Sequence, residues 1–127
     1  MQDFRKLDVW REAHRCVLSV YAVTKSFPAD ERFALVSQMR RSAASVPTNI
    51  AEGCGRQTSK DFARFLDIAA GSASELEYQL LLARDLGYLS PEAHPDLENQ
   101  TRRVRRMLAG LIRSVRGSDR KPTTQDR

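Results

Sequence analysis

Residues 38–56 read QMRRSAASVPTNIAEGCGR. Apolar residues recur here in steps of three and four, which is the spacing of a helix that packs along a neighbouring helix. Pro47 lies inside this stripe and removes one backbone hydrogen bond, but the stripe continues past it, so we expect one kinked helix. The helix should run from about Asp30 to Gly53 or Gly55. Its stripe consists of Val36, Met39, Ala43, Val46 and Ile50.

Three other segments have the same periodicity. They predict helices over about residues 7–26, from 59 or 60 to 86, and from 90 or 95 onward. Four amphipathic helices joined by short turns indicate an all-α fold, an antiparallel up-down-up-down four-helix bundle. We expect the bundle domain to fill residues 1–116. Residues 117–127 carry no hydrophobic side chain and should form a flexible polar C-terminal tail.

The composition restricts the class of protein. With 127 residues, 41% hydrophobic and 29% charged, the chain should form one soluble domain with its own core. It has no apolar signal core and no run of ~18 apolar residues, so we expect a cytoplasmic protein without a membrane partner. Cys16 and Cys54 should then be free, buried thiols. His14 and His94 stand apart and no Cys-x-x-Cys occurs, so we expect no metal ion and no cofactor.

Arginine side chains dominate the last predicted helix. The net charge of the chain is +5, and no acidic residue occurs between positions 102 and 116. One interpretation is a face that binds nucleic-acid phosphates, with Arg40 of the second helix as a further candidate contact. The other is a solvated face whose cations interact with the negative end of the helix dipole. The candidate nucleic-acid-binding residues on this helix are Arg102, Arg105, Arg106, Arg113 and Arg116.

The second and third predicted helices carry small or apolar residues on more than one face. A helix in a bundle needs one apolar stripe, so a second stripe indicates a buried subunit interface. Six consecutive small residues, 69–74, would allow another helix to approach closely, and this packing would offset the cost of Gly71. Candidate interface or structural residues are Arg41, Ala44, Pro47, Asn49, Glu52, Gly71 and Ser72.

Polar residues of the second helix have alternative interpretations. Arg40 and Arg41 point about 100° apart, so they cannot both face one ligand squarely. Arg41 and Glu52 share one face, where they could join a salt-bridge network, within or between subunits, that fixes assembly; phosphate contact by Arg41 is the alternative. No nucleophile or metal cluster accompanies Asn49 and Glu52, so they are not a general acid–base site. We therefore expect no enzymatic activity.

Several short motifs occur together and in a fixed order. As a set they resemble a bacterial four-helix bundle family first noticed as open reading frames within intervening sequences of 23S ribosomal RNA genes, with the accessory variability proteins of diversity-generating retroelements as distant relatives. The resemblance covers about residues 4–115. The motifs are LDVW at 7–10, FPxxE at 27–31, QxRR at 38–41, NIAEG at 49–53, AxGSxxELxxQL at 69–80 and LG at 86–87.

The resemblance implies an antiparallel four-helix bundle that assembles into a ring-like homopentamer. It also implies binding of RNA or DNA, with the biochemical role of most members unresolved. The family often has glycine after the aromatic residue that opens the second helix, where this chain has Ala34. Our leading hypothesis is a non-enzymatic oligomeric bundle that binds structured RNA or another nucleic acid. The rival is a protein-interaction scaffold or accessory subunit.

Overall fold

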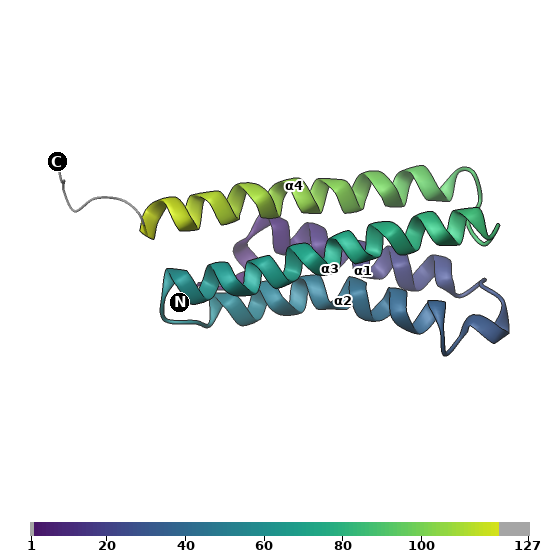
Figure 1. Cartoon of the computed structure of the whole chain (residues 1–127), viewed down its shortest axis with the longest axis horizontal. Coiled ribbons are helices and arrows are strands. Elements are labelled where there is room, and N and C mark those ends of the chain that lie inside the picture. Colours follow the sequence, from purple (N-terminus) through teal and green to yellow (C-terminus); the bar gives the residue numbers. More distant parts are fainter. Residues whose placement is uncertain (1, 120–127) are drawn as a thin grey trace.

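The computed structural model describes residues 2–119, which form four long helices with no strand among them (Figure 1). Successive helices run in opposite directions and are joined by short connections, so the predicted all-α four-helix bundle is confirmed. The elements are η1 (Phe4–Lys6), α1 (Asp8–Thr24), η2 (Ala29–Glu31), α2 (Leu35–Cys54), α3 (Ser59–Asp85) and α4 (Ala93–Asp119).

The start of α2 differs from the prediction. The helix begins at Leu35 rather than near Asp30, because Ala34 has φ −119° and ψ −102°, outside the helical region. The preceding acidic residues form the short helix η2 instead. Glu31 still contacts the start of α2, since its carboxylate accepts a hydrogen bond from the Leu35 amide at 3.4 Å. Glu31 therefore caps α2 from outside rather than forming part of its first turn.

The last helix extends further towards the C-terminus than predicted. It begins at Ala93, whose amide donates to the Ser90 hydroxyl at 3.0 Å. Pro95 lies in the first turn, where its missing N–H costs little, so it does not delay the helix. The helix then passes through Gly117 to Asp119, which moves the predicted boundary at residue 116. The rest of the predicted tail lies outside the described residues.

The core is almost entirely aliphatic and extends along the whole bundle. One buried cluster includes Val20, Met39 and Leu80, and the other includes Ile50 and Leu66. The thiols of Cys16 and Cys54 are buried as predicted. Pro47 is also buried, and α2 continues through it as one helix. Within residues 2–119, no helix combines the length and apolar character that a membrane crossing requires.

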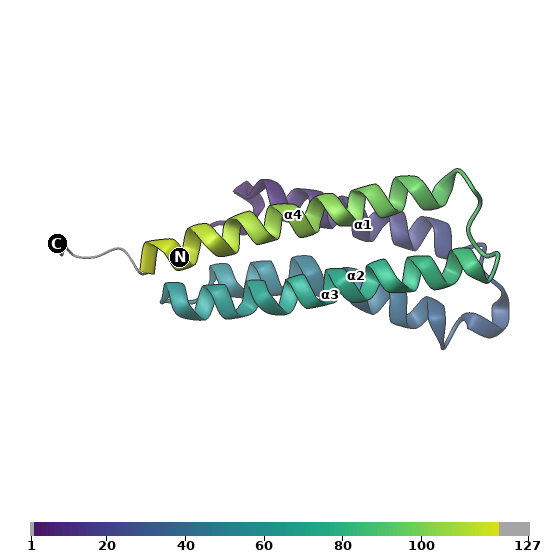
Figure 2. The ribbon, with the colours of Figure 1, turned by 45° about the horizontal axis from the view of Figure 1, so that its top comes forward.

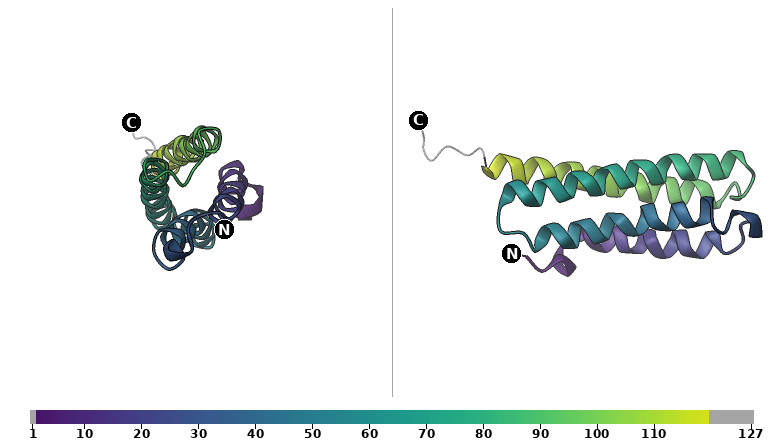
Figure 3. Two further views of the ribbon diagram at one scale, coloured as in Figure 1. Left: turned by 90° about the vertical axis from the view of Figure 1, so that its right-hand side faces the viewer. Right: turned by 60° about the horizontal axis from the view of Figure 1, so that its bottom comes forward.

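In the bundle, α3 packs against both α2 and α4, and α1 packs against α2 and α4 (Figures 2 and 3). Gly53 lies at a close contact between α2 and α3. A Cβ atom there would lie 2.8 Å from Phe62 Cδ1 and 3.1 Å from Phe65 Cβ. Gly71, in contrast, faces open space, so no other helix of the same chain packs closely against it, and close packing at Gly71 against another subunit stays a prediction.

A short polar chain also joins α2 to α3. The hydroxyls of Ser45 and Ser72 are 2.7 Å apart. The Asn49 side-chain amide donates to the carbonyl of Ser45 at 2.8 Å and to its hydroxyl at 3.0 Å. Asn49 and Ser72 are therefore structural residues within one chain.

Candidate nucleic-acid interface

Helix α3 places acidic side chains beside the arginines of α4. Glu77 lies between Arg102 and Arg105, which are about one helical turn apart. Arg102 Nε donates to Glu77 Oε2 at 3.0 Å, and Arg105 Nη1 donates to Oε1. A second carboxylate, Glu98 of α4, lies 3.2 Å from Arg102 Nη2. Two of the five predicted phosphate contacts are thus already bound to carboxylates.

The electrostatics of this cluster favour the ionised forms. Partial burial would raise the pKa of Glu77, but the hydrogen bonds from Arg102 and Arg105 and their positive charges outweigh it, so the net pKa is lowered. The hydrogen bond to Glu77, followed by the charge of Glu98, raises the pKa of Arg102. The cluster therefore stays charged, and it holds α3 to α4 at neutral pH.

A similar pair lies nearer the C-terminal end of α4. Arg116 donates from Nη1 to Asp67 Oδ1 at 3.3 Å and from Nη2 to Oδ2. Although no acidic residue occurs between positions 102 and 116, Arg102, Arg105 and Arg116 are paired with carboxylates from outside that stretch. The acids that pair with Arg105 and Arg116 come from α3, and Arg102 pairs both with Glu77 of α3 and with Glu98 of α4 itself.

Two arginines of this face, Arg106 and Arg113, have no ion-pair partner among residues 2–117, whose side chains the structure describes. Both are exposed. Arg106 also borders a groove of about 440 Å³ between α3 and α4, which is lined by both small or apolar residues and arginines. The groove is lined by Ala70, Ser74, Arg102, Arg105, Arg106, Ala109 and Ile112.

Arg40 lies elsewhere, on the α1–α2 side of the bundle. Its Nε donates to the Thr24 hydroxyl at 2.9 Å, and its Nη2 donates to the Tyr21 carbonyl at 3.3 Å. Its guanidinium also lies over the Tyr21 ring, 4.5 Å from the centroid. Arg40 thus satisfies groups at the C-terminal end of α1, and the fold does not bring it to the α4 face.

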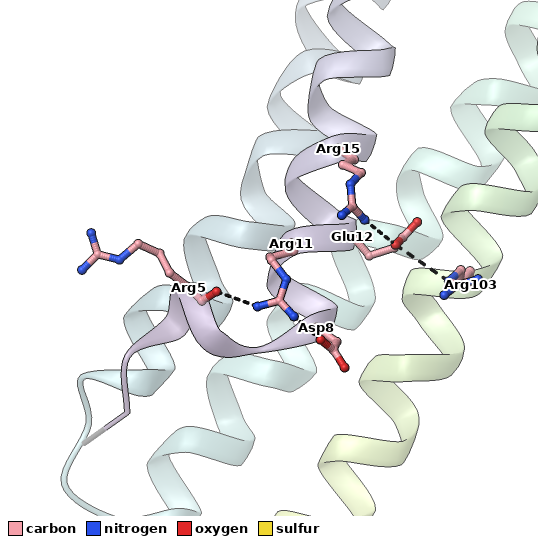
Figure 4. A network of polar contacts seen from close by, with 6 residues as sticks. All are labelled: Arg5, Asp8, Arg11, Glu12, Arg15 and Arg103. Atoms are coloured by element: carbon pink, nitrogen blue, oxygen red, sulfur yellow. Dashed lines mark hydrogen bonds and ion pairs between the residues drawn. The ribbon is translucent and has the colours of Figure 1, made fainter.

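Another arginine of α4 faces α1 instead (Figure 4). Arg103 Nε lies 3.8 Å from Glu12 Oε1, which also accepts a hydrogen bond from Arg15 at 2.9 Å. Near the start of α1, Arg11 donates to the carbonyl of Arg5 at 2.9 Å and pairs with Asp8. These contacts tie α1 to α4 and stabilise the beginning of α1.

The predicted interface residues of α2 lie along a groove between α1 and α2. The groove consists of two adjoining hollows of about 510 and 420 Å³, both of which Ala44 lines. Aromatic rings form much of its wall: Trp10 and His14 are stacked at 5.2 Å, and Phe33 is 89% exposed. Of the predicted residues, Ala44, Pro47 and Glu52 line the larger hollow and Arg41 lines the smaller.

The predicted Arg41–Glu52 network does not form within one chain. Glu52 instead pairs with Arg56 at 3.3 Å, one turn further along α2. Arg41 is exposed and forms no ion pair within the part of the chain that the structure describes. An intersubunit role for Arg41 stays a prediction.

The sequence matches one family model over residues 5–110, that of the 23S rRNA-intervening sequence protein. The chain belongs to the 23S rRNA-intervening sequence protein family. A crystal structure from Bacteroides thetaiotaomicron, described as a protein with unknown function from the S23 ribosomal protein family, has the same fold. It is 25% identical, with a TM-score of 0.77 over 83% of this chain and 95% of that one. No curated protein matches the sequence.

In this member of the 23S rRNA-intervening sequence protein family, sequence reasoning missed two features. The first is the pairing of Glu77 and Asp67 with α4, which no pattern within one helix reveals. The second is the aromatic wall of the α1–α2 groove. A weak signal for it exists, because Trp10, His14, Val17 and Tyr21 recur in steps of four, three and four along α1.

Proposed function

We propose that the protein is a non-enzymatic oligomeric bundle that binds structured RNA or another nucleic acid through the arginine face of α4. The observation that supports this most directly is the exposed charge of Arg106 and Arg113, which form no ion pair with any side chain that the structure describes. The arginine row from residue 102 to 116 spans about 21 Å, at about 1.5 Å per residue. A straight basic row of this length can contact several phosphates of one backbone.

The chemistry of the α3–α4 groove favours phosphate contact over base recognition. Its apolar lining residues are Ala70, Ala109 and Ile112, and none of its lining residues is aromatic. Single-strand binding proteins stack bases on aromatic rings, so this groove lacks the usual stacking platform. Guanidinium groups bind phosphate oxygens through paired hydrogen bonds. We therefore propose a double-stranded or otherwise structured nucleic acid, recognised through its backbone.

We further propose that the protein assembles into the ring-like homopentamer that the family resemblance implies. Two exposed surfaces of different character support assembly. One is the α1–α2 groove, and the other is the outer face of α3, where Ile68 and Tyr78 are 42% and 60% exposed. Two different patches that meet head-to-tail generate a closed ring when the rotation between subunits closes. A ring would repeat the arginine face and strengthen weak contacts through avidity.

A salt titration of the wild-type protein tests nucleic-acid binding. A fluorescently labelled RNA duplex should bind at about 50 mM salt, and its affinity should fall steeply towards 200 mM because each phosphate contact releases counterions. Absence of binding to any nucleic acid at the lower salt concentration would contradict the proposed nucleic-acid binding.

The second candidate function is a protein-interaction scaffold or accessory subunit. The aromatic α1–α2 groove favours it, because an exposed ring such as Phe33 is more typical of a binding surface than of a solvated loop. A pull-down from a native extract, with and without nuclease, separates the two functions. A protein partner that survives nuclease and is lost on Phe33→Ser would support the scaffold. Loss of all partners with nuclease would support nucleic-acid binding.

A further inference from the structure

Glu77 is bound in the way that a phosphate group would be. Each of its two carboxylate oxygens accepts a hydrogen bond from a different guanidinium, Oε2 from Arg102 and Oε1 from Arg105. The carboxylate lies beneath these groups, since the side chain of Glu77 is 20% exposed and those of Arg102 and Arg105 are 50% and 45% exposed. Two non-bridging phosphate oxygens can be held by two guanidiniums in the same manner.

The remainder of the groove is open to an external anion. Arg106 borders the same hollow and has no ion-pair partner among the residues that the structure describes. Arg113 follows it along the exposed face of α4. An incoming backbone could therefore attach to Arg106 and Arg113 first and then compete with Glu77 for the other two arginines.

We propose that Glu77 is an internal competitor of phosphate that determines which ligands the α4 face accepts. This inference rests on the proposed nucleic-acid binding. An isolated phosphate would bind at only one site on this face. To do so it must displace the carboxylate of Glu77, which the fold holds in place at high effective concentration. A phosphodiester backbone brings adjacent phosphates together, so contacts at Arg106 and Arg113 offset the displacement of Glu77. The face thus favours extended polyanions over small phosphates.

A charge-matched pair of variants tests the competition. Glu77→Gln removes the carboxylate charge while keeping a side chain of the same length. Glu75→Gln makes the same change in net charge on the same helix, where the exposed Glu75 forms no ion pair with any described residue. For an RNA duplex at one salt concentration, we expect E77Q to bind about tenfold more tightly than E75Q. The salt dependence of E77Q should also be steeper, because Arg102 and Arg105 then contact phosphates.

The outcomes separate the inference from the function on which it rests. If wild type binds the duplex and E77Q behaves like E75Q, the competition is overturned and nucleic-acid binding stands. If none of the three proteins binds, both proposals fail. If only E77Q binds, the competition is supported, since Glu77 alone then blocks the site.

A measurement on the wild-type protein avoids any folding defect of the variants. The Arg102 Nε–H resonance, assigned by nitrogen-15 labelling, reports the hydrogen bond to Glu77. It should shift when the RNA duplex is added, and it should shift much less with inorganic phosphate at the same phosphate concentration. An unchanged resonance at saturating duplex would contradict the displacement of Glu77.

Discussion

Gly53 and Gly71 show how differently two helical glycines can act in one bundle. Both interrupt runs of good helix formers, and both occur in motifs that the family resemblance uses. Gly53 is buried where the ring of Phe62 and the Cβ atom of Phe65 pack against α2, whereas Gly71 has open space around it. The residue type alone does not distinguish these two roles, because the close approach at Gly53 is created by side chains of another helix.

Substitution of Gly53 by alanine should destabilise the bundle. The new Cβ would overlap Phe62 and approach Phe65 Cβ, and overpacking of this kind costs about 1–3 kcal/mol, which exceeds the helix-propensity gain. Gly110→Ala is the control, because its Cβ would meet only the end of Arg113 at 3.9 Å. Urea unfolding should show a lower free energy of unfolding for Gly53→Ala than for wild type. For Gly110→Ala the free energy of unfolding should be unchanged or higher by less than about 1 kcal/mol. Equal effects would contradict the packing described at Gly53.

The ion pairs of Glu77 make stability depend on pH. The folded-state pKa of Glu77 lies below its ordinary value of 4.5, so its contribution is fully present above that value and is lost as pH falls through the lowered pKa. Glu77→Gln should therefore be less stable than wild type at pH 7, and the difference should shrink below about pH 4.5. Urea unfolding of both proteins from pH 7 to pH 3 measures this. A difference that stays constant with pH would contradict the ionic contribution.

The contact between α2 and α3 combines an aliphatic seam with the Ser45–Ser72 hydrogen bond. Because both hydroxyls are only half-buried, the bond should add a modest coupling between the helices. A double-mutant cycle with Ser45→Ala and Ser72→Ala should give a coupling energy of about 0.5–1.5 kcal/mol. Asn49→Ala should reduce that coupling, since Asn49 donates to the Ser45 hydroxyl. A coupling energy near zero would mean that packing alone joins the two helices.

Those features of the helices that depend only on residues within the same helix could be predicted from the sequence. The stripe from Val36 to Ile50 lies in the core as predicted, and Thr58 caps α3 through its hydrogen bond from the Asp61 amide. The start of α2 could not be predicted, because Ala34 adopts a non-helical conformation that no residue type requires. The acids facing α4 could not be predicted either. Glu77 and Arg102 are 25 residues apart in sequence and meet only after α3 and α4 pack.

Assembly of the whole molecule should depend on the outer face of α3. Ile68 lies on this face and is partly exposed within one chain. If the face is buried between subunits, Ile68→Glu should place an unpaired charge in the interface and reduce the mass of the particle. Lys60→Glu reverses a charge at an exposed position near the start of α3 and serves as the control. Light scattering should give five times the chain mass for wild type and the control, and a stable wild-type monomer would contradict the ring.

Nucleic-acid binding through α4 is tested most directly by comparing two double variants of equal charge. Arg106→Gln with Arg113→Gln removes two exposed cations of α4 that form no ion pair with a described side chain. Lys25→Gln with Arg32→Gln removes two exposed cations from the opposite end of the bundle. Anisotropy titrations of an RNA duplex at several salt concentrations give affinity and salt slope. The α4 variant should bind at least about tenfold more weakly than the control, with a salt slope lower by about 2. Equal affinity and slope for the two variants would contradict binding through the arginine face.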